Sequence, residues 1–427
     1  MSQDSKSLGA IEGLNADPLY LTALASLGAS VPAKLTATPS KGSIAVLPFV
    51  DMSGEVGHEH FTDGLTEDII TDLSNVPGLF VIARNSVFAY KGKPADVRQI
   101  AHDLGVKYIL EGSARRAGQR LRINVQLIDA AEGGAHVWAE RFDRELADIF
   151  AVQDEVTRRI VETITGKLIA SPIAQRYRPT NLEAYDLCVR ARNLWSLSKA
   201  LNQEAHGLLV RAVALDPDYA EAHWQLALVH LCTWLYWSNE QEPHRHNALI
   251  AGQRAVDLAP NDSSAQWALG YVLAHERRWD EAKAHFEASL HMNPNDADAH
   301  AICADFKIMF GLPEEGLEFA AKALRLNPRP PRWYYWILGV AQIANGQYEN
   351  AVTSLRREET YRTGSRRVLA AALALSGHVE EAREEARFFL IDNPDFHVAK
   401  WIRNQAFKDQ RDAKFWTDAY LLAGLPE

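Results

Sequence analysis

The sequence predicts a multidomain fold in which an α/β domain with a mixed sheet is followed by an all-α array of repeated helix pairs. Three observations predict this class. Strand-like apolar runs alternate with helical patterns over residues 43–170. A period of about 34 residues, marked by prolines, runs through residues 184–394. Ten of the 11 tryptophans follow residue 190, which indicates that the two parts are built differently.

The composition is that of a folded protein with an acidic balance. The 427 residues include 45 Lys and Arg and 55 Asp and Glu, and the formal net charge is −10. At roughly 100–200 residues per domain, two or three domains are expected. The acidic balance argues against broad electrostatic binding to nucleic acid but does not exclude a local basic patch. Three distant cysteines without metal-ligand spacing fit a reducing compartment: Cys188, Cys232 and Cys303.

Residues 1–42 are predicted to be a disordered or poorly ordered lead-in, because Ser, Ala, Thr, Gly and Pro dominate them. Their longest apolar stretch, Leu19–Val31, has 13 residues, whereas a transmembrane helix needs about 20. The segment before that stretch carries three acidic residues and one lysine, which is a poor match to a signal peptide. We therefore expect a cytoplasmic protein. The alternative is a periplasmic protein that is cleaved near Ala29–Ala33.

The α/β domain begins with a predicted strand at Ser43–Phe49, an apolar run closed by a proline. A helix follows, for which Asp63 is the expected N-cap and Pro77-Gly78 the stop signal. A second strand is predicted at Leu79–Ala83. A second helix is predicted at Asp96–Leu104, with a glycine at its C-terminal end.

The second half of this domain changes to a period of two. A strand is predicted at Tyr108–Ser113, and Arg120–Ile128 alternates between polar and apolar residues. Such alternation is typical of an antiparallel strand with one face on the core and the other in water. A further strand at His136–Phe142 and a long amphipathic helix at Ala147–Leu168 complete the domain. The order β-α-β-α-β-β-β-α favours an α/β or α+β domain with a mixed sheet.

Five segments of this part resemble one known domain family. They read SIAVLPF, FTDGLTEDIITDLS, FVIARNSVFAYKG, DVRQIAHDLGVKYILEGSARRAGQRLRINVQLIDA and HVWAERFDRELADIFAVQDEVTRRIV. Over about residues 43–165 they are similar to the TolB-like α/β domain, which has no catalytic motif to carry over. In bacteria this domain often precedes tetratricopeptide repeats and follows a class III adenylate cyclase domain or a winged-helix DNA-binding domain. The resemblance therefore implies a role in cyclic-nucleotide signalling or transcription regulation.

Prolines that follow helical runs mark the repeats of the second part. They stand at positions 217, 260, 294, 328 and 394, with gaps of 43, 34, 34 and 66 residues. The gaps correspond to single repeats, the first with a nine-residue insertion, and to one double repeat. Small residues recur in phase where two helices must approach closely. In the first helices of the repeats these include Ala227, Gly270, Ala304, Gly339 and Ala370, and in the second helices Ala282 and Gly316.

The clearest repeat, from Trp267 to Pro294, resembles a tetratricopeptide repeat. We predict about six such repeats over residues 184–394, a linker at 171–183 and capping helices at 395–427. The resemblance implies a right-handed superhelix in which each repeat buries its apolar face against its neighbours. It also implies a concave surface that binds an extended peptide or a helix of a protein partner.

Two groups of residues are candidates for a partner-binding groove. The first falls early in the first helices of successive repeats, a stretch that helps to line the groove in the family. It comprises His223, Trp224, Gln266, Trp267 and His300. The second is the aromatic cluster with Trp333 and Trp336, which opens the fifth repeat. The alternative for the aromatic residues is that they fill gaps between helices.

Four arginines flank the predicted turn of the α/β domain: Arg115, Arg116, Arg120 and Arg122. They are a candidate basic patch for a phosphate, a nucleotide or an acidic partner. The alternative is the solvated face of a hairpin, which the alternation already explains. No glycine-rich phosphate loop accompanies them, and the nearby glycines are turn glycines.

The sequence contains no recognisable catalytic set, cofactor motif or metal-ligand cluster. There is no Ser/His/Asp set, no Cys/His pair and no motif of paired carboxylates. A class III cyclase needs a domain of its own with two metal-binding carboxylates, and only 42 residues precede the TolB-like stretch. We therefore expect no enzyme activity, no cofactor and no metal.

Together these features favour a cytoplasmic, non-enzymatic protein-interaction module that binds a protein partner in the repeat groove. Direct binding to nucleic acid or membrane is not expected. The alternatives are an adenylate cyclase-related protein without its catalytic domain, and a periplasmic TolB-like envelope protein. An exposed sheet edge would permit homo-oligomers. The identity of the partner, the pathway, the oligomeric state and a small ligand of the TolB-like domain stay open.

Overall fold

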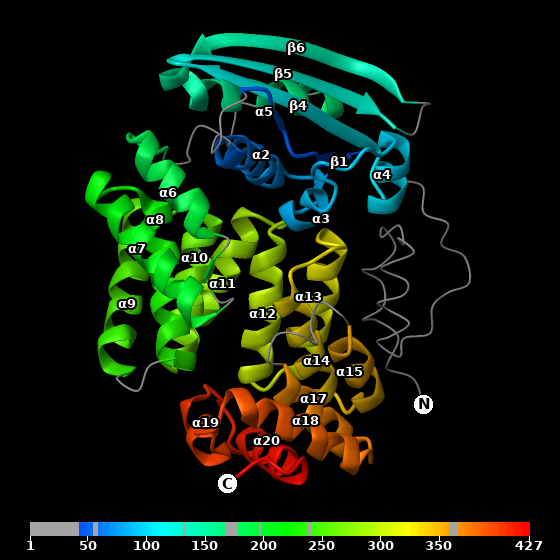
Figure 1. Cartoon of the computed structure of the whole chain (residues 1–427), viewed down its shortest axis with the longest axis vertical. Coiled ribbons are helices and arrows are strands. Elements are labelled where there is room, and N and C mark those ends of the chain that lie inside the picture. Colours follow the sequence, from blue (N-terminus) through cyan, green and yellow to red (C-terminus); the bar gives the residue numbers. More distant parts are fainter. Residues whose placement is uncertain are drawn as a thin grey trace, which may run out of the picture.

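The computed structural model describes most of the chain that follows the predicted lead-in. The described residues are 42–53, 59–130, 134–166, 178–192, 194–195, 198–237, 241–357 and 365–427. The predicted lead-in therefore lies outside them apart from Gly42, and so do residues 171–177 of the predicted linker. Figure 1 shows a sheet with its helices at one end of the molecule and a stack of helices that runs from there to the C-terminus.

Six strands of the described chain form one sheet. They are β1 (Ser43–Val46), β2 (Val50–Asp51), β3 (Phe80–Val81), β4 (Tyr108–Ala117), β5 (Arg120–Asp129) and β6 (Ala135–Glu145). The strand order is β3-β1-β4-β5-β6, and β2 also pairs with β4. β1 is parallel to β3 and β4, whereas β4, β5 and β6 are antiparallel neighbours. The mixed sheet that the sequence predicts is confirmed.

The alternation in β5 decides which face of the sheet meets the core. The apolar residues from Leu121 to Leu127 are buried, while the polar residues Arg120, Arg122 and Asn124, which alternate with them, are exposed. Two helices, α2 (Glu59–Ser74) and α5 (Ile149–Thr165), contribute to the same apolar core as these residues. The sheet therefore keeps one face on its helices and one face polar.

Local signals locate most helices of this domain, with one wrong N-cap and one helix missed. α4 (Val97–Leu104) follows Asp96, whose side chain caps the helix, and ends at a glycine in the left-handed conformation. The expectation that Asp63 caps α2 is wrong, because α2 begins one turn earlier and Asp63 forms an ion pair with Lys91 at 2.7 Å. The short helix α3 (Arg84–Phe88) has no counterpart among the predicted elements.

The described helices of the second part form six neighbouring pairs. These are α6 (Leu182–Arg192) with α7 (Lys199–Leu215), α8 (Ala220–Cys232) with α9 (Gln241–Leu258), α10 (Ser263–His275) with α11 (Trp279–Met292), α12 (Ala297–Met309) with α13 (Pro313–Leu326), α14 (Arg332–Ala344) with α15 (Tyr348–Leu355), and α17 (Arg366–Leu375) with α18 (Val379–Asp392). α19 (Val398–Asn404) and α20 (Gln410–Leu422) follow, and α20 packs on α17. The nine-residue insertion falls after α8, where Thr233–Trp237 form a π-helical turn.

The predicted small residues stand where the helices of a pair approach closely. A Cβ atom added to Gly339 would lie 2.6 Å from Leu355 Cγ. One added to Gly316 would lie 3.0 Å from the carbonyl oxygen of Ala304. Since such distances are shorter than ordinary van der Waals contact, a larger residue at either position would push the two helices apart.

The helices and the cysteines can be compared with two further expectations, one on membrane-spanning segments and one on disulfides. Crossing a membrane takes about 20 apolar residues, and no helix within the described ranges combines that length with sufficient hydropathy. Cys188, Cys232 and Cys303 are buried free thiols, so the described fold is held together by packing and not by disulfides among them.

Candidate functional site

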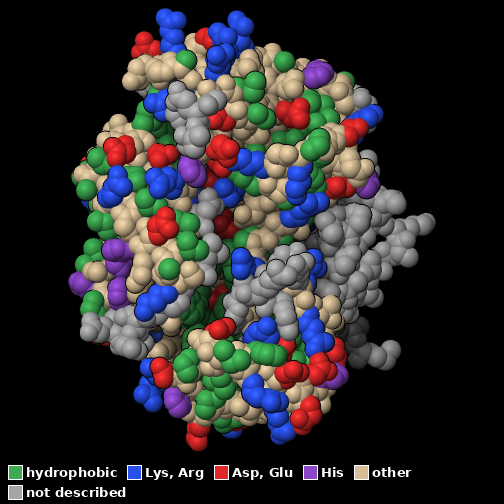
Figure 2. Space-filling view, in the orientation of Figure 1, with side chains coloured by type: hydrophobic (Ala, Val, Ile, Leu, Met, Phe, Trp, Pro, Cys, Tyr) green, Lys and Arg blue, Asp and Glu red, His purple; other side chains and the backbone are tan. Residues whose placement is uncertain are grey.

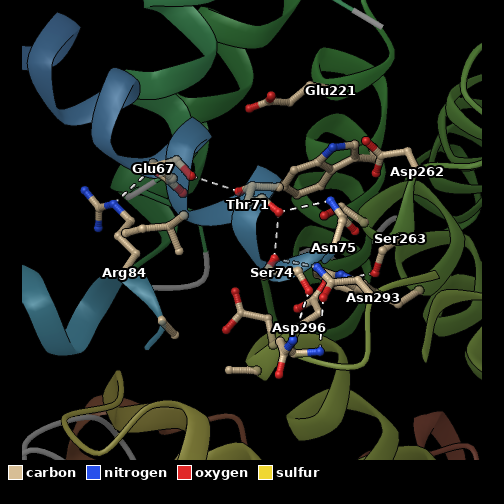
Figure 3. Close-up of a pocket in the computed structure, with 18 of the residues that line it drawn as sticks. Glu67, Thr71, Ser74, Asn75, Arg84, Glu221, Asp262, Ser263, Asn293 and Asp296 are labelled. Carbon is tan, nitrogen blue, oxygen red and sulfur yellow. Dashed lines mark hydrogen bonds and ion pairs between the residues drawn. The ribbon is translucent and has the colours of Figure 1, made fainter. Parts of the chain in front are cut away.

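A cavity of about 710 Å³ lies where the α/β domain meets the helix pairs. One wall comes from α2 and α3. The other comes from the N-terminal ends of α8, α10, α12 and α14 and from the turns that precede them. Figure 2 shows this face of the molecule hollowed below the sheet domain, and Figure 3 shows side chains that line the cavity. A cavity of this size is typical of sites that bind ligands.

Two asparagines in the turn before α12 hold the end of α2. Asn293 Nδ2 donates a hydrogen bond to Ser74 Oγ at 2.8 Å, a contact visible in Figure 3. Asn295 Nδ2 donates to the backbone carbonyl of Ser74 at 3.0 Å and to that of Leu79 at 2.8 Å. Carbonyl groups at a helix C-terminus have no partner within the helix. The repeat turn supplies such a partner for the carbonyl of Ser74, and its other two bonds add to the contact between the α/β domain and the array.

The next repeat turn holds α3 in a similar way. Ser86 Oγ donates to Asn327 Oδ1 at 2.6 Å and accepts from the backbone N–H of Arg329 at 2.8 Å. The backbone N–H of Ala83 donates to the carbonyl oxygen of Leu326 at 2.9 Å. These bonds attach α3 to the turn that precedes α14.

A chain of charged side chains crosses the same interface. Arg84 of α3 pairs with Glu67 of α2 at 2.9 Å, and Arg192 of α6 pairs with Glu67 at 2.6 Å. Arg192 also pairs with Glu221 of α8. Burial alone would lower the pKa of Arg192, but the charges of Glu221 and Glu67 outweigh that effect and keep the pKa above its ordinary value. The guanidinium therefore stays charged between its two carboxylates.

Three of the predicted groove residues line the cavity: Trp224, Trp267 and Trp333. They come from three helices, α8, α10 and α14. The rings of Trp224 and Trp267 lie 6.0 Å apart between centroids, and both side chains are buried, whereas Trp333 is half-buried. All three side chains therefore line the cavity on the wall that the helix pairs form. Their participation in binding stays a prediction.

Three other predicted groove residues have a structural contact in common. Each directs a side-chain nitrogen to the carbonyl oxygen of the proline six positions earlier, at 2.7–3.0 Å. These pairs are His223 with Pro217, Gln266 with Pro260, and His300 with Pro294. The contact secures the turn that leads into each first helix. The spacing of six from each repeat proline is a sequence signal that could have revealed it.

The remaining groove candidate, Trp336, lies outside the cavity lining. Its half-buried ring packs against the apolar clusters formed by the last helix pairs. Here the alternative interpretation of the aromatic residues, that they fill gaps between helices, describes the observed contacts.

The four predicted arginines do not share one face of the sheet. Arg115 and Arg122 are direct cross-strand neighbours, and Arg120 lies on the same face as Arg122. Arg116 pairs with Leu121 in the register, so it points to the opposite face. Arg122 is in an ion pair with Asp143 at 2.6 Å. A binding role of this group stays a prediction, and none of the four lines the cavity.

A histidine cluster between α7, α8 and α9 was not predicted. The ring of His230 lies 5.0 Å from that of His206 and 5.7 Å from that of His244. Burial lowers the pKa of His230 to about 4, so this imidazole is neutral at physiological pH. Within the described ranges, no group of three or more His, Cys, Asp or Glu side chains is arranged to hold a metal ion.

Two family models match separate parts of the chain. Residues 40–159 match the HilA/YgeH-like transcriptional regulator, second domain. Residues 273–336 match the tetratricopeptide repeat, and they contain α11, α12 and α13. The prediction of tetratricopeptide repeats is confirmed for that segment. The first part is thus similar to a domain of transcriptional regulators.

One similar curated protein is the putative adenylate cyclase 3 of Rhizobium meliloti (strain 1021). It is 49% identical over 249 residues, which cover 57% of this chain and 42% of the relative. The chain therefore spans less than half the length of that protein.

Solved helical-repeat proteins show weaker likeness. A thermophilic TPR protein from Thermus thermophilus is 18% identical, with a TM-score of 0.37, over 44% of this chain and 98% of its own. Human IFIT1, solved as a dimer with m7Gppp-AAAA, is 17% identical, with a TM-score of 0.44, over 66% of this chain and 68% of its own.

Proposed function

We propose that this protein is a non-enzymatic interaction module that holds a segment of a partner protein at the cavity between the α/β domain and the repeats. The observation that carries this proposal is the shared wall of Trp224, Trp267 and Trp333. Tryptophan is enriched among residues that dominate binding energy at protein interfaces. Three helix pairs and a rigidly docked domain hold these rings in one place, which reduces the ordering cost of binding.

We further propose that the module serves bacterial signalling or transcription regulation in the cytoplasm. The match to a transcriptional regulator domain and the name of the Rhizobium relative support a regulatory role. We retain the finer expectations as part of this proposal: a TolB-like domain over residues 43–170 and about six repeats over 184–394 in a right-handed superhelix. The sequence motifs quoted for the TolB-like domain and the helix pairs support them.

A partner-capture experiment with matched tryptophan variants tests the proposal. The tagged chain, a Trp333→Ala variant and a Trp279→Ala variant are each purified from the native cell, and the proteins that follow them are identified by mass spectrometry. Trp333 lines the cavity, and Trp279 is a half-buried tryptophan outside it. We expect one protein to follow the unmodified chain and Trp279→Ala, and to be lost with Trp333→Ala.

Two outcomes would contradict the proposal. The same proteins recovered with all three chains would place the binding surface outside the cavity. Adenylate cyclase activity of the purified chain would contradict the non-enzymatic part of the proposal; the name of the Rhizobium relative makes this the activity to measure.

A further inference from the structure

The charges on the cavity wall do not balance. Arg84 and Arg192 are the arginines of the lining, and both are paired with Glu67 or Glu221. Two aspartates of the opposite wall, Asp296 and Asp298, form no ion pair with another described residue. Asp296 caps α12 by accepting from the backbone N–H of Ala299 at 2.9 Å, and Asp298 accepts from Tyr334 Oη at 2.5 Å. Among the described residues, the site therefore offers negative charge that no cation pairs.

The pKa of Asp298 reflects this excess of negative charge in the cavity wall. Burial raises its pKa to about 7, and the negative charge of Asp296 adds to the shift. The other groups that face Asp298 are Tyr334 of α14, Glu67 of α2 and Arg84 of α3. Arg84 lies near enough to lower the pKa, but its effect is smaller than that of burial. A cation bound in the cavity, in addition to Arg84 and Arg192, would stabilise the ionised form of Asp298.

Trp267 indicates a second, independent property of the ligand, a hydrogen-bond acceptor. Its side chain is 3% exposed and forms part of the cavity wall, and its indole Nε1–H has no acceptor among the described residues. A buried donor without an acceptor is unfavourable, so a bound segment that seats a carbonyl oxygen against this nitrogen would be favoured here. The neighbouring indoles of Trp224 and Trp333 offer apolar faces that attract an organic cation.

We propose that the cavity binds a basic segment of the partner protein, with a lysine or arginine side chain directed to Asp296 and Asp298. A backbone carbonyl of the same segment accepts the hydrogen bond of Trp267 Nε1. One polypeptide supplies both groups, a cation on an apolar stem and a carbonyl oxygen, whereas an acidic segment or a phosphate would find both arginines of the lining already paired. This inference rests on the proposed function and names the chemistry of its partner.

Peptide pools of defined charge test the inference on the full chain. The probes are three pools of fluorescein-labelled random decapeptides that share one central residue: lysine, norleucine or glutamate. Fluorescence anisotropy at pH 8 is expected to show the lysine pool binding about tenfold more tightly than the norleucine pool, because a charge pair in a partly dry site contributes at least this much. The glutamate pool is expected to bind most weakly.

Substitutions and a change of pH test whether the preference for the lysine pool depends on Asp298. Asp298→Asn keeps an acceptor for Tyr334 and removes the charge, so the preference for lysine should disappear. Asp218→Asn is the matched control, since Asp218 is exposed, pairs with Arg254 and lies outside the cavity lining. Because Asp298 is protonated below its pKa of about 7, affinity for the lysine pool should rise about tenfold from pH 6 to pH 8, and binding should release a proton. Trp267→Phe should weaken the lysine and norleucine pools equally.

Several outcomes would overturn the inference. Equal affinities of the lysine and norleucine pools, or tightest binding of the glutamate pool, would do so. Displacement of the lysine pool by micromolar spermidine would assign the site to a free polyamine. A captured partner that depends on Trp333 but still binds Asp298→Asn would refute the basic segment while leaving the proposed function intact. Failure of both the peptide pools and the partner capture would refute both.

Discussion

Replacing Arg192 with methionine is expected to lower the free energy of unfolding by about 3–5 kcal/mol, because the buried Glu221 and the largely buried Glu67 lose their shared cation. Arg192 is 12% exposed, and its partners Glu67 and Glu221 are 14% and 8% exposed. Glu67 retains Arg84, whereas Glu221 keeps the hydrogen bonds that a neutral tyrosine and a neutral glutamine donate to it. The loss should appear as a lower midpoint of urea unfolding of the full chain, followed by circular dichroism.

A matched exposed pair gives the control for Arg192. Arg211 pairs with Glu183 at 3.2 Å, and both side chains are more than 60% exposed. Arg211→Met should therefore change the free energy of unfolding by about 0–1 kcal/mol. Adding Glu221→Gln to Arg192→Met should recover part of the stability, since a neutral amide replaces a carboxylate that has lost the charge of Arg192. Equal losses for Arg192→Met and Arg211→Met would mean that the interface network does not stabilise the fold.

Two glycine-to-alanine changes in helices are expected to have opposite signs. In Gly64→Ala the new Cβ would lie 2.4 Å from Tyr185 Oη and 2.9 Å from Val189 Cγ2, at the contact between α2 and α6. Tyr185 would have to move, and its 2.9 Å hydrogen bond to the buried Asp68 would break. Overpacking of this kind costs about 1–3 kcal/mol. Gly207 of α7 has open space around it, so Gly207→Ala should stabilise the protein by about 0.5–1 kcal/mol.

Thermal unfolding of the two glycine variants in parallel checks this prediction. Gly64→Ala should lower the unfolding midpoint and Gly207→Ala should raise it, although both changes add the same methyl group to a helix. A higher midpoint for both variants would contradict the tight docking of α2 on α6. Partner capture with Gly64→Ala would then show whether the defined position of the α/β domain matters for binding.

Sequence reasoning succeeded where one local pattern decides the structure. The alternation of Arg120–Ile128 predicted β5, and the helix predicted at Asp96–Leu104, with Gly105 at its C-terminal end, is α4. It failed for Asp63, which lies inside α2 and pairs with Lys91, a partner 28 residues away that no local pattern reveals. It also missed α3, which is held by Asn327 and Arg329 through Ser86.

The candidate site shows the same division. The repeat period places Trp224 and Trp267 early in the first helices of their repeats, and an aromatic cluster singles out Trp333. The structure brings all three to the lining of one cavity. The period could not separate them from His223 and His300, which bind the proline carbonyls of their own turns. The tryptophans of the cavity and the histidines bonded to proline carbonyls occupy neighbouring positions in the first helices of the repeats. Only the contacts in the structure distinguish the two groups.

By itself, the sequence determined most of the strands and helices, the helix-pair period and the glycines at close contacts. These follow from patterns within a few turns of chain, where periodicity and steric limits act directly. Only the tertiary structure decided how the α/β domain sits on the repeats, because that arrangement depends on pairs such as Asn293 with Ser74 that are 219 residues apart. The cavity, its paired arginines and the place of Asp298 in its wall exist only through that docking, since each wall comes from a different part of the chain.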